Sequence, residues 1–166
     1  HVLMEKPPTP TVGELDAITE HARARGRILF TTWHSQYNKA VDEAQRMFRV
    51  LQLMCDEAVI EGRFAGFGYA LDKYAGYELG ANGWKTVERS GPLQVHAVRE
   101  GLALSEPGAD EPLPKILPEK PQLLCAPTGD IGEHDIVIAL TGAREGWRVA
   151  LNREGASELR PWTAAP

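Results

Sequence analysis

Four segments alternate along the first 50 residues, and their order constrains the fold more than any other feature. A short apolar run at residues 1–4 stops at Pro7-Pro8, because paired prolines end a strand and stiffen the adjoining backbone. Thr11 and Glu14 have the spacing of a capping box, so we expect a helix from there to a stop at Gly26.

A second apolar run, residues 28–32, indicates a buried strand, and a second amphipathic helix is expected to start near Asn38. The apolar positions recur at helical intervals: Val12, Leu15, Ile18 and Ala22 in the first helix, and Val41, Ala44, Phe48, Leu51 and Met54 in the second. This order of strand, helix, strand and helix favours a parallel βαβ unit with a right-handed crossover. The further strands of a parallel sheet would come from later in the chain or from a longer chain.

The rest of the chain has a different character. Residues 62–91 hold seven of the 16 glycines mixed with aromatic residues, which indicates loops and short strands. Six of the 12 prolines lie at 107–127, so an extended surface segment or linker is expected there and a helix is not. Residues 135–140 and 147–151 are expected to pair as a hairpin. The predicted fold class is α/β at the start, β-rich at the end, and α+β overall.

Composition excludes several classes of function. Lys and Arg total 18 against 23 Asp and Glu, a net charge of −5, which argues against a nucleic-acid partner and against a polybasic membrane surface. No apolar run approaches the ~20 residues that span a bilayer, and no signal peptide is recognisable at the start. The sequence therefore predicts neither a nucleic-acid partner nor a membrane partner.

The two cysteines, Cys55 and Cys125, are 70 residues apart and form no metal-binding pattern. One disulfide is possible, but two buried thiols in a reducing cytoplasm are the favoured interpretation. A cytoplasmic location is expected on this basis. Glu133-His134-Asp135 could suggest metal ligands, but neighbours on a strand point to opposite faces, so surface charges are favoured and no metal is predicted.

Three side chains of distinct chemistry come after the two N-terminal strands. Lys6 lies just after the first, and Trp33-His34 lie just after the second. Ligands bind along the carboxyl edge of open parallel sheets, so these residues could share one small-molecule site. The plainer alternative is a solvated lysine, a structural histidine and a core tryptophan.

Glu5-Lys6-Pro7 after a short apolar strand, with the segment Thr32–Asn38, resembles the glucose–fructose oxidoreductase/inositol dehydrogenase family. The resemblance covers residues 1–48 and is nearest to the galactose and arabinose 1-dehydrogenase branch. It implies a sugar 1-dehydrogenase that uses NAD or NADP and converts an aldose to its lactone. A small-molecule sugar and a homo-oligomer are the implied partners.

The resemblance also implies residue roles. Lys6 would contact the sugar and help to remove the C1 hydroxyl proton, which needs a lysine pKa lowered toward ~7–8. His34 would be a second catalytic and sugar-binding residue. Glu5, Pro7 and Trp33 would form the nicotinamide pocket, and Asp72 would bind the sugar, although its spacing is off by one and a turn aspartate is the competing interpretation.

The glycine-rich dinucleotide motif of that family is not found. Gly66-Phe67-Gly68 begins a G-x-G pattern, but Leu71 breaks G-x-G-x-x-G. We therefore expect residues 1–36 to be the closing βαβ of a Rossmann-like domain and residues 37–166 to be a reduced substrate and dimerisation region. The alternatives are a non-catalytic truncated homologue acting as a binding or oligomerisation module, and an unrelated small α/β domain with a chance local match.

Overall fold

The computed structural model describes residues 2–4, 11–27, 29–31, 34–109, 111–153 and 155–164. By compactness the chain divides into two units, His1–Lys39 and Ala40–Pro166. Compactness does not test the roles predicted for residues 1–36 and 37–166, and that division stays a prediction.

Among its described residues, the first unit contains the helix α1, one pair of short strands and the first residues of α2. β1 (Val2–Met4) and β2 (Leu29–Thr31) pair in parallel, and α1 (Val12–Ala24) connects them, as the βαβ pattern predicts. The capping box is confirmed: the Glu14 amide donates to Thr11 Oγ1 at 3.3 Å, and the Thr11 amide donates to Glu14 Oε2 at 3.2 Å. Gly26 lies just after the helix with a positive φ of 59°, which glycine adopts without strain.

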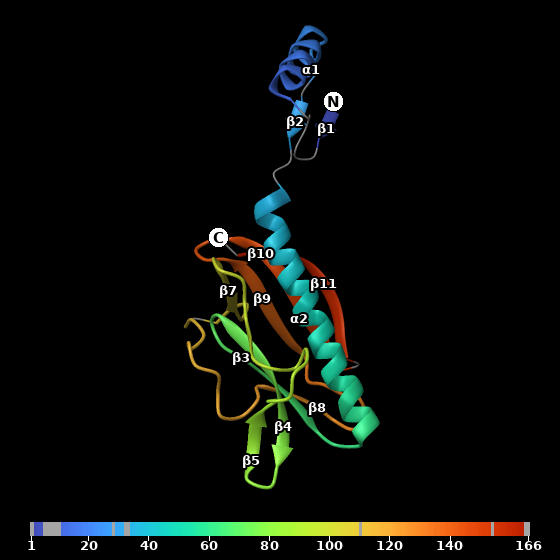
Figure 1. Ribbon diagram of the computed structural model, residues 1–166, viewed down its shortest axis with the longest axis vertical. Coiled ribbons are helices and arrows are strands. Elements are labelled where there is room, and N and C mark those ends of the chain that lie inside the picture. Colours follow the sequence, from blue (N-terminus) through green and yellow to red (C-terminus); the bar gives the residue numbers. More distant parts are fainter. Residues whose placement is uncertain are drawn as a thin grey trace. The chain divides into compact units, whose positions relative to one another are not determined.

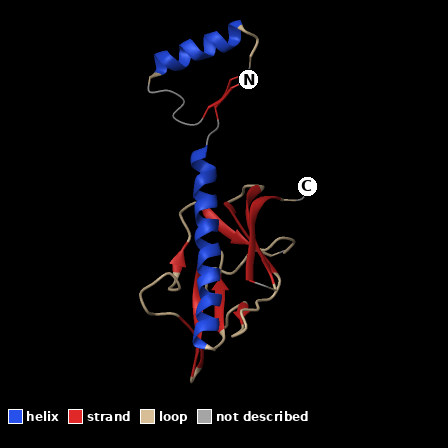
Figure 2. Ribbon diagram, turned by 90° about the vertical axis from the view of Figure 1, so that its right-hand side faces the viewer, coloured by secondary structure: helices blue, strands red, loops and turns tan. Residues whose placement is uncertain are grey.

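The second unit packs the helix α2 against two antiparallel sheets (Figures 1 and 2). α2 spans His34–Glu61, so it begins before the expected Asn38, and its residues from Ala40 onward belong to this unit. The Pro-rich residues 107–127 contain no helix among those described, and β8 lies at their end.

Each sheet of the second unit has a simple order. One contains β5 (Gly83–Thr86), β4 (Lys73–Gly80), β3 (Ala65–Tyr69) and β8 (Leu123–Cys125), with β6 (His96–Ala97) also paired to β4. The other contains β11 (Gly155–Thr163), β10 (Glu145–Asn152), β9 (His134–Leu140) and β7 (Leu102–Ser105). The expected hairpin is confirmed as β9 and β10.

The core lies between α2 and the inner faces of both sheets. The buried stripe of α2 includes Ala44, Met47, Leu51, Met54 and Ala58. It packs in one cluster with Phe67, Tyr69 and Tyr74 of the first sheet and Ile136, Ile138 and Val149 of the second. The apolar residues of α2 therefore form a helix face because two sheets cover it.

The outer face of β3 explains the glycines of Gly66-Phe67-Gly68. A Cβ at Gly68 would lie 2.5 Å from Tyr77 Cε2, and a Cβ at Gly66 would lie 2.7 Å from Pro121 Cβ. The Tyr77 hydroxyl donates to the Pro118 carbonyl at 2.6 Å, which holds the ring over these glycines. The two glycines allow close packing of Tyr77 and the Pro-rich segment on the strand.

The predicted fold class is confirmed only at its coarser level. The chain is a mixed α+β protein with two helices among the described residues. Parallel pairing within them is confined to the three-residue strands β1 and β2, and both larger sheets are antiparallel. The described residues therefore show no larger Rossmann-like parallel sheet beyond this one pair of strands. No helix among the described residues combines the length and apolar character needed to cross a bilayer.

Candidate functional site

The structure describes few of the predicted site residues. Glu5, Lys6, Pro7 and Trp33 lie outside the described residues. His34 is the first residue of α2, and its side chain is not described. That Lys6, Trp33 and His34 share one small-molecule site stays a prediction.

Asp72 lies in the turn between β3 and β4, and its side chain is exposed. Its carboxylate is 3.4 Å from Lys73 Nζ, and its backbone carbonyl accepts from the Val98 amide at 2.9 Å. The predicted sugar-binding role of Asp72 stays a prediction, and the geometry described is that of a turn residue.

A polar cluster that sequence reasoning missed lies where α2 meets β4 and β6. Glu43 has only 1% of its surface exposed. Its Oε1 accepts from the Tyr74 hydroxyl at 3.1 Å and lies 2.8 Å from His96 Nε2, while Arg99 Nε is 3.9 Å from Oε2. A buried carboxylate is costly unless it is hydrogen-bonded, and these partners supply the bonds.

The Tyr74 hydroxyl in this cluster stays protonated. Burial is the main cause that raises its pKa, and the negative charge of Glu43 raises the pKa further. The sequence did carry a signal for the cluster, because Glu43 falls within the apolar stripe of α2 beside Ala44 and Met47. An acidic residue at such a position needs a buried partner, but its identity depends on strands far along the chain.

A second polar cluster joins β3 to the other sheet. The Tyr69 hydroxyl donates to Glu106 and also contacts His134 Nε2, which is 3.6 Å from Glu106 Oε1. Burial is again the main cause that raises the Tyr69 pKa, and the hydrogen bond to Glu106 is the second cause. The three groups satisfy one another, which favours a structural link between the sheets.

The residues Glu133, His134 and Asp135 have separate partners. Glu133 is 3.8 Å from Arg153, His134 faces Tyr69, and Asp135 accepts from Arg148 Nε at 2.7 Å. Within the described ranges, no group of three or more His, Cys, Asp or Glu side chains could hold a metal ion.

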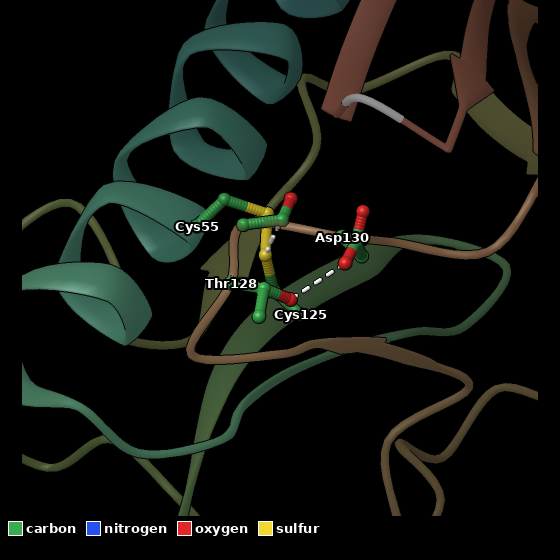
Figure 3. Close-up of a disulfide and its surroundings, with 5 residues drawn as sticks. Cys55, Cys125, Thr128 and Asp130 are labelled. Carbon is green, nitrogen blue, oxygen red and sulfur yellow. Dashed lines mark hydrogen bonds between the residues drawn. A yellow bond between two sulfur atoms is a disulfide. The ribbon is translucent and has the colours of Figure 1, made fainter.

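A disulfide joins α2 to the first sheet (Figure 3). Cys55 of α2 and Cys125 of β8 are bonded, with their Cα atoms 5.3 Å apart. Beyond Cys125 the chain turns back through residues 126–130, where Thr128 Oγ1 donates to Asp130 Oδ2 at 2.6 Å. The predicted free thiols are wrong. A separation of 70 residues carries no local signal, and only the packing of α2 on β8 brings the two sulfurs together.

A hollow lies on the exposed side of α2. It encloses about 620 Å³ and is lined by Asp42, Arg46, Arg49 and Leu53 of α2 together with Pro92 and Arg99. Arg99 Nη1 donates to Asp42 Oδ2 at 3.1 Å across one side. We call this feature the arginine hollow.

Comparison with known proteins identifies the fold. No protein-family model matches the chain. Two structures of the minor pseudopilin EpsH from the type II secretion system of Vibrio cholerae are similar, each 24% identical in sequence. One covers 75% of this chain and 97% of its own length with a TM-score of 0.57. The crystal structure covers 80% and 99% with a TM-score of 0.62.

The solution structure of E. coli GspH is also similar. It is 17% identical, covers 79% of this chain and 93% of its own length, and has a TM-score of 0.61. These identities are low, so the likeness establishes a shared fold and nothing finer. The described α+β fold is therefore one that minor pseudopilins adopt.

These findings overturn the dehydrogenase interpretation. The resemblance to the glucose–fructose oxidoreductase/inositol dehydrogenase family is wrong as an account of this chain, because the structures that match it are secretion pseudopilins. Three further predictions that rest on this resemblance are therefore wrong: the sugar oxidation, the NAD or NADP cofactor, and the sugar and homo-oligomer partners. The alternative of a truncated dehydrogenase homologue is wrong for the same reason.

Proposed function

We propose that this chain is a structural subunit of a type II secretion-type assembly, with the role of a minor pseudopilin. The observation that carries the proposal is the match of its fold to nearly the whole length of EpsH and GspH. A subunit of this kind works through protein contacts. The two polar clusters, whose groups pair with one another, fit that role better than they fit catalysis.

The disulfide supports a location in an oxidising compartment. Bonds such as Cys55–Cys125 persist outside the reducing cytoplasm, for example in the bacterial periplasm. The cytoplasmic location rested on two free thiols, and their pairing removes that basis. We therefore place the unit Ala40–Pro166 on the oxidising side of the membrane, where a secretion subunit would meet its partners.

Photo-crosslinking of the full chain tests the proposal. A crosslinking amino acid replaces Ile60, which is 82% exposed at the end of α2, or Ile116, which is 80% exposed in the Pro-rich segment. Illumination of cells that contain the secretion system should yield crosslinks from at least one position to other pseudopilin subunits, identified by mass spectrometry. Absence of such crosslinks from both positions would overturn the proposal.

A compartment measurement complements the crosslinking. Cells are quenched with acid, free thiols are blocked, and the state of Cys55 and Cys125 is determined by mass spectrometry. We expect the disulfide-bonded form to dominate. Full alkylation of both cysteines without reduction would contradict the proposed location.

A further inference from the structure

Two arginines on the exposed side of α2 differ from the other arginines of their unit. Six of those others have a carboxylate within salt-bridge distance: Arg63, Arg89, Arg99, Arg148, Arg153 and Arg160. Arg144 also has a partner. Within the described part of the chain, the polar partner of Arg46 is the hydroxyl of Tyr74, and no hydrogen bond or ion pair is found for Arg49. Both side chains line the arginine hollow.

The hollow combines this positive charge with apolar surface. Asp42 is already paired with Arg99, and among the described residues no carboxylate lies within salt-bridge distance of Arg46 or Arg49. Val50 is buried beneath them, and Leu53 is partly buried at the same place. Exposed ion pairs contribute little by themselves, so a tight contact here needs apolar burial beside the charges. Arginine and apolar side chains together are typical of the energetically important part of protein interfaces.

We propose that the arginine hollow binds an acidic segment of another protein subunit, with carboxylates on Arg46 and Arg49 and an apolar side chain on Leu53. This inference rests on the proposed function and names the chemistry of the partner. A segment of several residues suits a hollow of about 620 Å³, which is much larger than one inorganic anion needs.

An anionic lipid surface fits the same arginines less well. Asp42 lies in the hollow, and the whole chain carries a net charge of −5, so a plane of negative headgroups would meet repulsion around the two arginines. A discrete segment can place its carboxylates on Arg46 and Arg49 and keep them away from Asp42.

A peptide-binding measurement tests the docking site. The probe is a fluorescein-labelled twelve-residue peptide with Glu and Leu at helical spacing, and the matched peptide has Gln in place of Glu. Fluorescence anisotropy with the full chain should show saturable binding of the Glu peptide that weakens as salt rises. The Gln peptide should bind on the order of tenfold more weakly, which corresponds to about 1.4 kcal/mol. Equal binding of the two peptides, or no binding of the Glu peptide, overturns the proposal.

Charge-reversal variants locate the binding. Arg46→Glu/Arg49→Glu should abolish binding of the Glu peptide. Arg153→Glu/Arg160→Glu makes the same charge change at arginines outside the hollow and should leave most of the binding intact. Because Arg46 contacts Tyr74, the single variant Arg49→Glu keeps the test valid if the double variant misfolds, and circular dichroism checks the fold. An equal loss in the control variant overturns the proposal.

Three further outcomes separate this inference from its alternatives. Vesicles of phosphatidylglycerol that bind the chain through Arg46 and Arg49, when the Glu peptide does not bind, would make the hollow a lipid site and overturn the protein docking site. If crosslinks to pseudopilin subunits persist unchanged in Arg46→Glu/Arg49→Glu, and this variant still binds the peptide, the docking site fails and the proposed function stands. If arginine-dependent peptide binding occurs without any crosslink to a pseudopilin subunit, the proposed function fails instead.

Discussion

The two compact units of the chain are stabilised in different ways. In His1–Lys39, none of the residues whose exposure is described is buried, and Ile18 on the apolar side of α1 is 36% exposed. In Ala40–Pro166, α2 and both sheets share one buried cluster, and a disulfide closes it. The first unit depends on local interactions such as the capping box, and the second depends on contacts between distant parts of the chain.

This difference shows why clear local signals can mislead about function. The capping box and glycine stop of α1 specify a helix that is real, but they say nothing about what surrounds it. The fold shared with known structures extends over 75–80% of the chain, which is more than the first unit could supply. Changes that remove long-range contacts should therefore affect the second unit much more than the first.

Removing the disulfide should have the largest effect. The Cys55→Ala/Cys125→Ala variant frees a loop of about 70 residues in the unfolded chain and should lower the free energy of unfolding by about 4 kcal/mol. Urea unfolding monitored by tryptophan fluorescence measures the loss. Hydrogen exchange should accelerate in residues 40–61 and stay unchanged in residues 12–24. A loss below about 1 kcal/mol would show that the second unit does not depend on the cross-link.

Gly68→Ala should have the next largest effect. The added methyl group would meet the ring of Tyr77, so the ring or the strand must move, at a cost of roughly 1–3 kcal/mol. Gly132→Ala is the matched control, because its Cβ would meet nothing within 4 Å. The same urea titration compares the two variants. Equal stability of both would mean that the packing of Tyr77 on β3 is not tight.

Alkaline pH should destabilise the second unit. Burial and the charge of Glu43 raise the pKa of Tyr74 above its ordinary value, so the unfolded state loses the phenolic proton first as pH rises. Stability is therefore full below about pH 10 and falls above it, by at most about 1.4 kcal/mol per pH unit for this one group. Urea titrations from pH 8 to 11 measure the fall, and Tyr74→Phe should make it shallower. If stability falls with pH equally steeply in this variant, the pKa of Tyr74 is not raised in the folded state.

Thr11→Ala should have the smallest effect and should act only on the first unit. It removes the side-chain acceptor for the Glu14 amide, which costs about 1 kcal/mol of helix stability. Hydrogen exchange should accelerate in residues 12–24, while peptides from residues 40–61 serve as the internal control. Faster exchange in both units would show that they are coupled more strongly than their separate stabilisation implies.

Much of the secondary structure could be predicted from local patterns. The capping box, the β9–β10 hairpin and the lack of a helix in the described part of 107–127 result from interactions between near neighbours or from backbone limits. The parallel pairing of β1 and β2 follows from the order of strand, helix and strand along the chain. The candidate site could not be predicted in the same way. The start of α2 at His34 was missed because apolar periodicity begins only further along the helix.

The sequence alone determined the amphipathic stripe of α2, the acidic residue within it and the irregular Pro-rich segment. Only the tertiary structure decided that Glu43 meets Tyr74 and His96, that Cys55 meets Cys125, and that the glycines of β3 serve packing. Local conformation depends on steric limits and hydrogen bonds between near neighbours. Which distant segments meet depends on how α2 and the two sheets bury their apolar faces together. This depends on all the residues of the core and not on any one segment.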